Sequence, residues 1–152
     1  KLINIEICQQ VFNIEEKYLI EQKYIKAGIK HKLFDFDDQL FNKISDYDLA
    51  ISRSGASAIA ELAFLNIPFV AIPFPFAKDD HQYFNAKFYV DKNFGWLINE
   101  HEIFENYFYQ FYEKNIHNKQ MLDNKVEKMS NFIFEGSWSE NLNMIEQTFY
   151  EN

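Results

Sequence analysis

Short apolar runs alternate with longer stretches of helical periodicity along residues 1–100 of the chain. The apolar runs are the predicted strands Leu2–Cys8, Lys32–Phe36, Asp48–Ser52, Pro68–Pro73 and Gly95–Ile98. The stretches between them are predicted helices at about 13–28, 39–44, 55–65 and 80–93. Such alternation predicts an α/β fold with a parallel sheet and helices on both faces. Ligands bind such sheets at the carboxyl ends of the strands, so we expect functional residues just after Phe36, Ser52 and Pro73.

Cap residues mark the ends of the predicted helices. Asn13 is placed as an N-cap, with Glu15 and Glu16 in the first turn, and Gly28 is placed for a left-handed turn at the end. The apolar residues of this first helix are Ile14, Tyr18, Tyr24 and Ile25. Asn66 follows the third helix and tolerates a left-handed turn there.

Beyond Glu100 the chain is predicted to be helical. Its apolar residues repeat every three to four positions, which is typical of the buried face of a helix. They are Ile103, Phe104, Tyr107, Phe108, Phe111 and Tyr112. We therefore expect residues 101–152 to form a C-terminal helical segment that packs on the domain formed by residues 1–100.

Composition narrows the classes of protein that this chain can belong to. At 152 residues with 47% hydrophobic residues, it is long enough for one domain with a sizeable core. Its net charge of −8 argues against general affinity for nucleic acid or anionic lipid, because both need a positive field. The single cysteine, Cys8, excludes an intrachain disulfide and suits a reducing cytosol. No run approaches the roughly 20 apolar residues of a membrane span.

The segment after the third predicted strand has the pattern of an anion site. A tight turn and a helix start are built from small residues, so a ligand can approach the backbone closely. These residues are Ser54, Gly55, Ala56, Ser57 and Ala58. The free N–H groups and positive dipole end of the helix would bind phosphate oxygens, and Glu61, four residues after Ser57, would accept bonds from ribose hydroxyls. The alternative is an ordinary helix start followed by a solvated glutamate.

A second candidate segment follows the fourth predicted strand. His81 and Gln82 lie in the first turn of the next predicted helix, and their neutral donors and acceptors suit sugar hydroxyls. A helix-start histidine without a ligand is the alternative. We interpret Asp79 and Asp80 as helix-start caps rather than metal ligands, and Asn85 as a residue that stabilises the turn or the helix rather than touching a ligand.

Together, the sequences FDDQL at 36–40, RSGASAIAEL at 53–62 and IPFVAIPFPFAKDDHQYFNA at 67–86 resemble the C-terminal domain of the MurG family. The resemblance covers residues 3–100 and implies a Rossmann-like domain of a GT-B glycosyltransferase. It implies that the amides of Ala56, Ser57 and Ala58 meet the phosphates and sugar of UDP-N-acetylglucosamine (UDP-GlcNAc). Glu61 would then bind the ribose, and His81 and Gln82 the sugar hydroxyls. Phe36 would lie against the uracil, with the Asp37 backbone reading its edge.

The resemblance also implies a larger enzyme than this chain. Members of the family transfer N-acetylglucosamine to a lipid-linked muramoyl-pentapeptide, giving lipid II, in the bacterial cytoplasm at the inner membrane. The glycine-rich loop and the acceptor domain, which carries the proposed base and the membrane contact, would precede Lys1. We therefore expect no catalytic residue, metal or cofactor in this chain, and no transferase activity from the chain alone.

Two departures from the family pattern and two alternative functions remain open. Ala58 replaces a frequent threonine, and Gln9 and Gln10 replace a His-Gln pair. One alternative function is a stand-alone nucleotide-sugar-binding subunit that docks on a separate membrane partner. The other is an enzyme similar to UDP-GlcNAc 2-epimerases, but the DDHQ sequence at 79–82 argues against this alternative.

Overall fold

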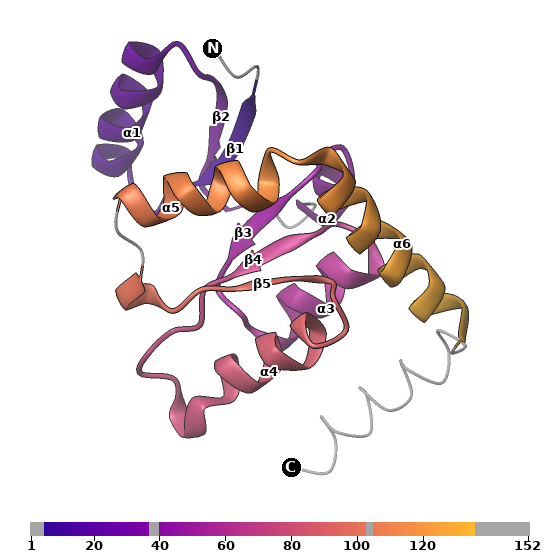
Figure 1. The fold of residues 1–152 in the computed structure, drawn as a ribbon. Helices are drawn as coiled ribbons and strands as arrows, with labels where there is room; N and C mark the ends of the chain where they lie inside the picture. Colours follow the sequence, from indigo (N-terminus) through magenta and orange to yellow (C-terminus); the bar gives the residue numbers. More distant parts are fainter. Residues whose placement is uncertain (1–4, 37–39, 103–104, 136–152) are drawn as a thin grey trace. The chain divides into compact units, whose positions relative to one another are not determined.

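A computed structural model describes residues 5–36, 40–102 and 105–135 of the chain (Figure 1). The chain divides into two compact units, Lys1–Lys43 and Ile44–Asn152. This division falls inside the domain that we expect at residues 1–100, and the boundary at residue 100 stays a prediction. The two units are described separately below.

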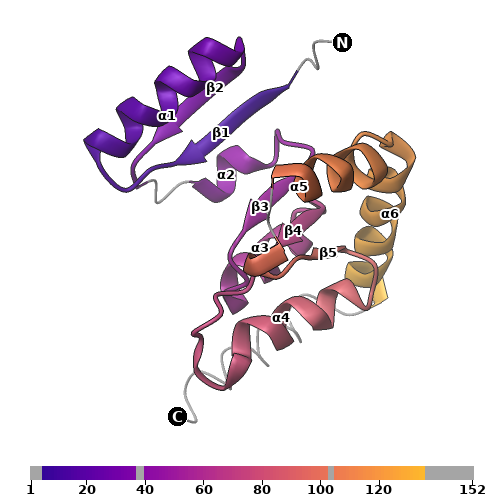
Figure 2. The ribbon, with the colours of Figure 1, turned by 60° about the vertical axis from the view of Figure 1, so that its left-hand side comes forward.

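The first unit is a β-α-β segment (Figure 2). Strand β1 (Glu6–Gln10) pairs in parallel with β2 (Lys30–Phe34), and α1 (Ile14–Ala27) connects them. The pairing places Glu6 opposite Lys30, and the carboxylate of Glu6 forms ion pairs with Lys30 and Lys32. Hydrogen bonds from these two lysines lower the pKa of Glu6.

Local capping defines both ends of α1, as the sequence predicts. The side chain of Asn13 accepts a hydrogen bond from the Glu16 N–H at 2.8 Å, and the Glu16 carboxylate accepts one from the Phe12 N–H at 2.7 Å. At the other end Gly28 has φ 66, and its N–H donates to the Ile25 carbonyl at 3.0 Å. Both predicted caps are confirmed.

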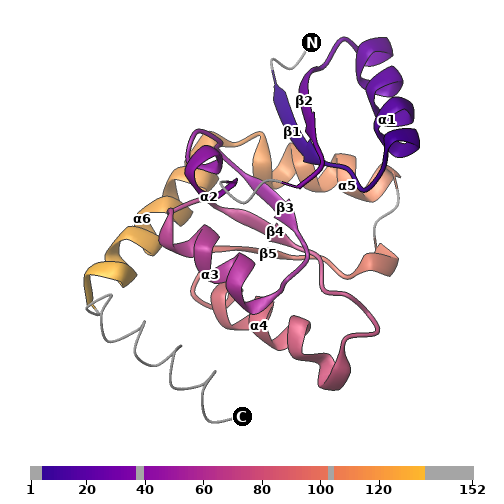
Figure 3. The same ribbon diagram turned by 180° about the vertical axis from the view of Figure 1, so that it is seen from behind.

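The second unit contains the larger sheet. Strands β3 (Ala50–Ser52), β4 (Phe69–Ala71) and β5 (Gly95–Leu97) pair in parallel in the order β3-β4-β5. Helices α3 (Ala56–Phe64) and α4 (His81–Val90) lie on one side of this sheet, and α5 (Glu105–Phe111) lies on the other (Figures 1 and 3). The other described elements of this unit are the 3₁₀ turns η1 (Lys78–Asp80) and η2 (Glu100–Glu102), the π-helical segment Tyr112–Ile116 and α6 (Lys119–Glu135). Helix α2 (Leu40–Ile44) lies at the boundary between the two units. The predicted parallel α/β fold with a helical C-terminal segment is confirmed for the described residues.

The core of the second unit joins elements from most of its length. Ile59 of α3, Phe69 of β4 and Phe94 before β5 are all at most 1% exposed, as is Met129 of α6. Packing is so close that a Cβ on Gly95 would lie 2.3 Å from the Phe69 carbonyl oxygen. Gly95 therefore lets β5 approach β4 at this point.

Some predicted boundaries are wrong by a few residues. Strand β1 ends at Gln10 rather than Cys8, and β2 begins at Lys30 and ends at Phe34 rather than Phe36. The physical reason is that the left-handed turn at Gly28 leads the chain into the second strand almost at once, and the Glu6–lysine pairs fix the register. Lys30 and Lys32 are polar, so a search for apolar runs does not find the true start of β2.

The expected buried face after Glu100 is only partly correct. Ile103 and Phe104 lie outside the described residues. Phe111 packs its ring edge-on against Trp96 of β5, with centroids 5.8 Å apart, and also contacts Phe108. Tyr107, however, is 41% exposed, so the predicted stripe is wider than the face that packs on the sheet.

Candidate functional site

The carboxyl ends of β3, β4 and β5 meet at one edge of the sheet, because the three strands are parallel. Residues 53–55 leave β3 at this edge, residues 72–77 leave β4, and residues 98–100 leave β5. Ser54 and Gly55 lie in the first of these segments, and the other candidate ligands after the third and fourth strands lie on the helices that follow, α3 and α4.

Helix α3 begins at this edge with an N-terminus that no side chain caps. Gly55 is the N-cap, with φ −60 and ψ 144, and a Cβ added there would meet no atom within 4 Å. The first intrahelical bond runs from the Ile59 N–H to the Gly55 carbonyl at 3.1 Å. The amides of Ala56, Ser57 and Ala58 therefore precede the helical hydrogen-bond ladder, as in any uncapped helix start.

Ser54 adds a buried hydroxyl next to this helix start. The residue is fully buried, and its Oγ has no hydrogen-bond partner within the described part of the chain. Its carbonyl accepts a hydrogen bond from the Asn85 side chain of α4 at 3.3 Å. Asn85 thus stabilises the turn before α3, which confirms the interpretation from the sequence. A buried hydroxyl without a partner beside free helix amides is a suitable environment for an anionic oxygen.

Glu61 lies on α3 one turn beyond Ser57, and its side chain is exposed. Residues four apart share a helix face and are separated by about 6 Å along the axis. A carboxylate at that distance from the helix start is within reach of a group attached to a bound phosphate. The structure leaves both interpretations of Glu61 open, as a ribose ligand and as a solvated charge.

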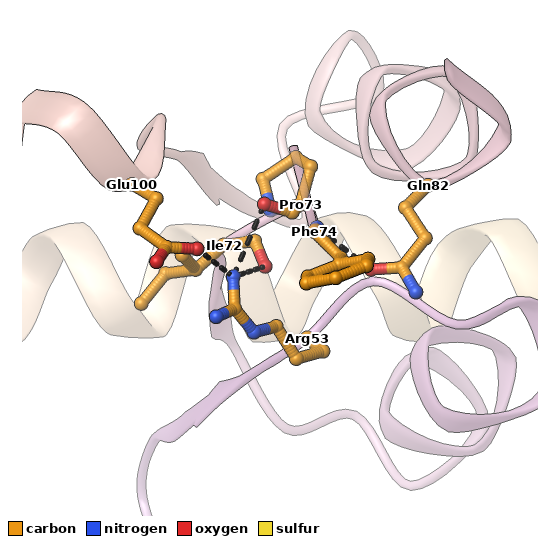
Figure 4. Close-up of polar contacts among 6 residues, drawn as sticks. All are labelled: Arg53, Ile72, Pro73, Phe74, Gln82 and Glu100. Carbon is orange, nitrogen blue, oxygen red and sulfur yellow. Dashed lines mark hydrogen bonds and ion pairs between the residues drawn. The ribbon is translucent and has the colours of Figure 1, made fainter. Parts of the chain in front are cut away.

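The side chains of His81 and Gln82 hold the start of α4 in place. The Gln82 Oε1 accepts a hydrogen bond from the Phe74 N–H at 2.9 Å (Figure 4). The His81 Nδ1 lies 2.7 Å from the Lys78 carbonyl oxygen, and the side chain is exposed. Both groups therefore contact the loop between β4 and α4, and no hydrogen bond from the amide nitrogen of Gln82 occurs among the described residues.

The predicted capping by Asp79 and Asp80 is wrong. Asp80 occupies the N-cap position of α4, but its side chain makes no capping hydrogen bond. Both aspartates have positive φ, 52 and 53, so the backbone before the α-helix is left-handed rather than helical at these two residues. Left-handed backbone is tolerated better by aspartate than by most residues, which explains the residue type here without a cap.

Arg53 begins the RSGASAIAEL segment, but the sequence assigns its side chain no role. Its Nη1 lies 2.6 Å from the Glu100 carboxylate, 3.2 Å from the Pro73 carbonyl oxygen and 3.5 Å from the Ile72 carbonyl oxygen (Figure 4). The guanidinium also lies 5.6 Å from the centre of the Phe74 ring. Its partners are at least 19 residues away along the chain, so no local pattern reveals the contacts.

The two residues predicted to meet the uracil belong to the first unit. Phe36 follows β2 and is 81% exposed, and Asp37 lies outside the described residues. In the same unit the side chain of Gln9 accepts a hydrogen bond from the Tyr24 hydroxyl. The structure therefore brings Ser54–Ala58, Glu61, His81 and Gln82 into one unit, and it leaves the predicted base contact untested.

No group of three or more His, Cys, Asp or Glu side chains that would hold a metal ion occurs in residues 5–36, 40–102 and 105–135. Over the same ranges no helix combines the length and apolar character needed to cross a bilayer.

Comparison with known families agrees with this arrangement. The profile of the glycosyltransferase family 28 C-terminal domain matches residues 2–135 of the chain. The chain is similar to a UDP-N-acetylglucosamine–N-acetylmuramyl-(pentapeptide) pyrophosphoryl-undecaprenol N-acetylglucosamine transferase of Pelagibacter ubique, with 38% identity over 144 residues. That match covers 95% of this chain and 40% of the relative. Similarly named transferases of Rickettsia canadensis and of a Sulfurovum species are 38% and 41% identical over 66% and 60% of the chain, which is 28% and 26% of their own lengths.

A solved structure has the same fold. The crystal structure of Acinetobacter baumannii MurG superposes with a TM-score of 0.75 over 85% of this chain and 37% of that one. The sequence identity is 24%, so this similarity supports the fold alone. The chain thus spans less than half the length of each of these relatives.

Proposed function

We propose a function from the premise that this chain belongs to the glycosyltransferase family 28 C-terminal domains. In this proposal it is the donor-binding part of an inverting glycosyltransferase that binds UDP-GlcNAc. The acceptor would be a lipid-linked muramoyl-pentapeptide, as the names of the curated relatives suggest. The same names favour the transferase over the epimerase-like alternative.

The observation that supports donor binding best is the start of α3. Its uncapped amides at Ala56–Ala58 stand beside the unpartnered, buried hydroxyl of Ser54. In our proposal the diphosphate lies at this helix start, where free N–H groups and the helix dipole stabilise negative charge. The same groups would stabilise the extra charge on UDP as it departs, which lowers the barrier to transfer.

The other predicted binding residues would contact the parts of the donor beyond the diphosphate. Glu61 would accept hydrogen bonds from the ribose hydroxyls, and His81 and Gln82 would bind the N-acetylglucosamine. Phe36 would lie against the uracil, with the Asp37 backbone reading its edge. The acceptor, the base and the contact with the cytoplasmic face of the inner membrane belong to a different domain in this proposal. The chain by itself would then bind donor and lack transferase activity.

Replacing Glu61 tests the proposal most directly. We expect Glu61→Ala in the full-length protein to cost about 1.5–3 kcal/mol of UDP-GlcNAc affinity, the range for hydrogen bonds to a charged group. This corresponds to roughly a ten- to hundred-fold rise in Kd by calorimetric titration. Stability should change little, because an exposed glutamate replaced by alanine loses no packing and gains helix propensity.

A donor that lacks the ribose hydroxyls provides the control. The difference between wild type and Glu61→Ala should nearly disappear for this donor, because the proposed partners of the carboxylate are absent. An unchanged affinity for UDP-GlcNAc in the variant would show that Glu61 is only a solvated charge and would remove the ribose assignment.

A further inference from the structure

One arginine connects the ends of all three strands of the larger sheet. Arg53 directly follows β3, its guanidinium bonds to carbonyl groups that follow β4, and its ion-pair partner Glu100 follows β5. Since β4 lies between the other two strands, the side chain passes over the end of the central strand. A planar guanidinium suits this position, because it presents several N–H groups in a fixed geometry.

The loop after β4 is held from two directions at a single peptide group, the one that joins Pro73 and Phe74. Arg53 donates to the Pro73 carbonyl at 3.2 Å, and the N–H of the same peptide group, that of Phe74, donates to the Gln82 side chain at 2.9 Å. Figure 4 shows Arg53 and Gln82 on opposite sides of Phe74. The Phe74 ring also lies under the guanidinium, at 5.6 Å from its carbon. The loop is thus tied to both β3 and α4.

The charge on Arg53 is largely satisfied within the protein. Its Nη1 is 2.6 Å from the Glu100 carboxylate, and the two side chains are 48% and 47% exposed. A movement of Nη1 toward a bound diphosphate would break this ion pair. The carbonyl bonds to the loop would be lost in the same movement, since the same nitrogen makes them.

We propose that Arg53 and Glu100 are positioning residues for the donor site. By holding the loop after β4 they fix Gln82 and the start of α4 relative to the start of α3, without touching the donor themselves. This inference rests on the proposed function, because it assigns the pair a role in the same UDP-GlcNAc site. It concerns residues outside the predicted ligand set.

The two possible roles of Arg53 predict opposite effects of removing Glu100. If Arg53 positions the loop, Glu100→Ala weakens the positioning and raises the Kd for UDP-GlcNAc. If Arg53 is a diphosphate ligand restrained by Glu100, the same change frees the cation and lowers the Kd. We expect Arg53→Ala and Glu100→Ala each to raise the Kd by roughly two- to five-fold, because the pair is half-exposed and acts on the donor only through the loop. Glu100→Gln, which keeps an acceptor, should recover part of the loss.

A matched ion pair on α4 gives the control. Lys87 and Asp91 pair at 2.7 Å with side chains 49% and 60% exposed, so their exposure is similar but they lie in the last turns of the helix. Lys87→Ala should leave the Kd unchanged. Thermal unfolding of each variant shows whether it is folded at the temperature of the titration, and a purely structural role would lower the unfolding temperature without changing the Kd.

Hydrogen exchange of the Phe74 amide, measured without ligand, tests the positioning role of Arg53 and Glu100 independently of the proposed donor binding. We expect exchange to be faster in Arg53→Ala and Glu100→Ala than in wild type, and unchanged in Lys87→Ala. If wild type fails to bind UDP-GlcNAc, the proposed function is wrong and the exchange result still decides whether the pair holds the loop. Tighter binding by Glu100→Ala, an unchanged Kd in both variants, or unchanged Phe74 exchange would overturn the inference.

Discussion

No residue of α1 in the first unit is buried, whereas α3 in the second unit buries Ile59, Leu62 and Ala63. The first unit is stabilised by short-range features: a capped helix, a glycine turn and ion pairs between adjacent strands. The second is stabilised by apolar contacts among residues from α3, β4, β5 and α6. The proposed diphosphate site therefore lies in the unit that has the buried core. A buried core keeps the backbone rigid, and a binding site needs a rigid backbone to keep its geometry.

The largest expected effect is in the core of the second unit. Phe94 is 1% exposed and packs against Tyr89 and Phe132, with ring centroids 6.0 and 5.4 Å away. We expect Phe94→Ala to lower the free energy of unfolding of this unit by about 3–5 kcal/mol, because it removes buried surface and leaves a cavity. Urea unfolding followed by tryptophan fluorescence measures this, since Trp96 lies in the same unit.

The matched change in the first unit is Phe12→Ala. Phe12 is 84% exposed, so the same truncation should change the free energy of unfolding by less than about 0.5 kcal/mol. A loss of similar size in both variants would show that the contrast between the units is wrong.

A smaller effect concerns the buried lysine of the second unit. Lys125 is 3% exposed, and its Nζ donates to the Asn93 side chain at 2.8 Å and to the Gly95 carbonyl at 3.0 Å. The ammonium also lies 4.1 Å from the centre of the Trp96 ring. These neutral partners do not replace water fully, and burial lowers the pKa of Lys125 from 10.5 to about 8.

The lowered pKa makes stability depend on pH. Between the two pKa values the unfolded chain binds more protons at this lysine than the folded chain does, so stability rises with pH. From pH 8 to about 9.5 we expect a gain of about 1–2 kcal/mol from this group, by the usual 1.36 kcal/mol per pKa unit. The window stops short of 10 because burial raises the pKa of Tyr89 above that value, which adds an opposite dependence at higher pH.

Urea unfolding across this pH range, in wild type and in Lys125→Met, measures the effect. The difference in free energy of unfolding between the two proteins should change with pH in the stated direction. A difference that stays constant from pH 8 to 9.5 would mean that Lys125 keeps an ordinary pKa despite its burial.

Apart from the Phe12→Ala control, the smallest effect is expected at the cap of α1. Asn13→Ala removes the acceptor for the Glu16 N–H and should cost about 1 kcal/mol, with Asn13→Asp nearly neutral. Hydrogen exchange in the first turn of α1 should become faster in Asn13→Ala, while amides of the second unit stay unchanged. Faster exchange throughout the second unit would show that the two units unfold together.

Much of the fold follows from local patterns in the chain. Apolar runs and helical periodicity predict the described strands and helices in their observed order, and Asn13 and Gly28 mark the ends of α1. The RSGAS turn predicts the uncapped start of α3. Each of these features depends on residues close together in the sequence, so a single chain is enough to predict them.

Other features depend on residues that only the folded chain brings together. Arg53 and Glu100 are 47 residues apart, and Lys125 meets Asn93 and Gly95 across at least 30 residues. Their residue types are ordinary for exposed positions, so nothing in the local pattern separates them from solvated charges. The burial and pairing of such groups are decided by the packing of the sheet edge and the core. Two residues that are far apart along the chain can be neighbours in space, and the sequence alone does not show which ones are.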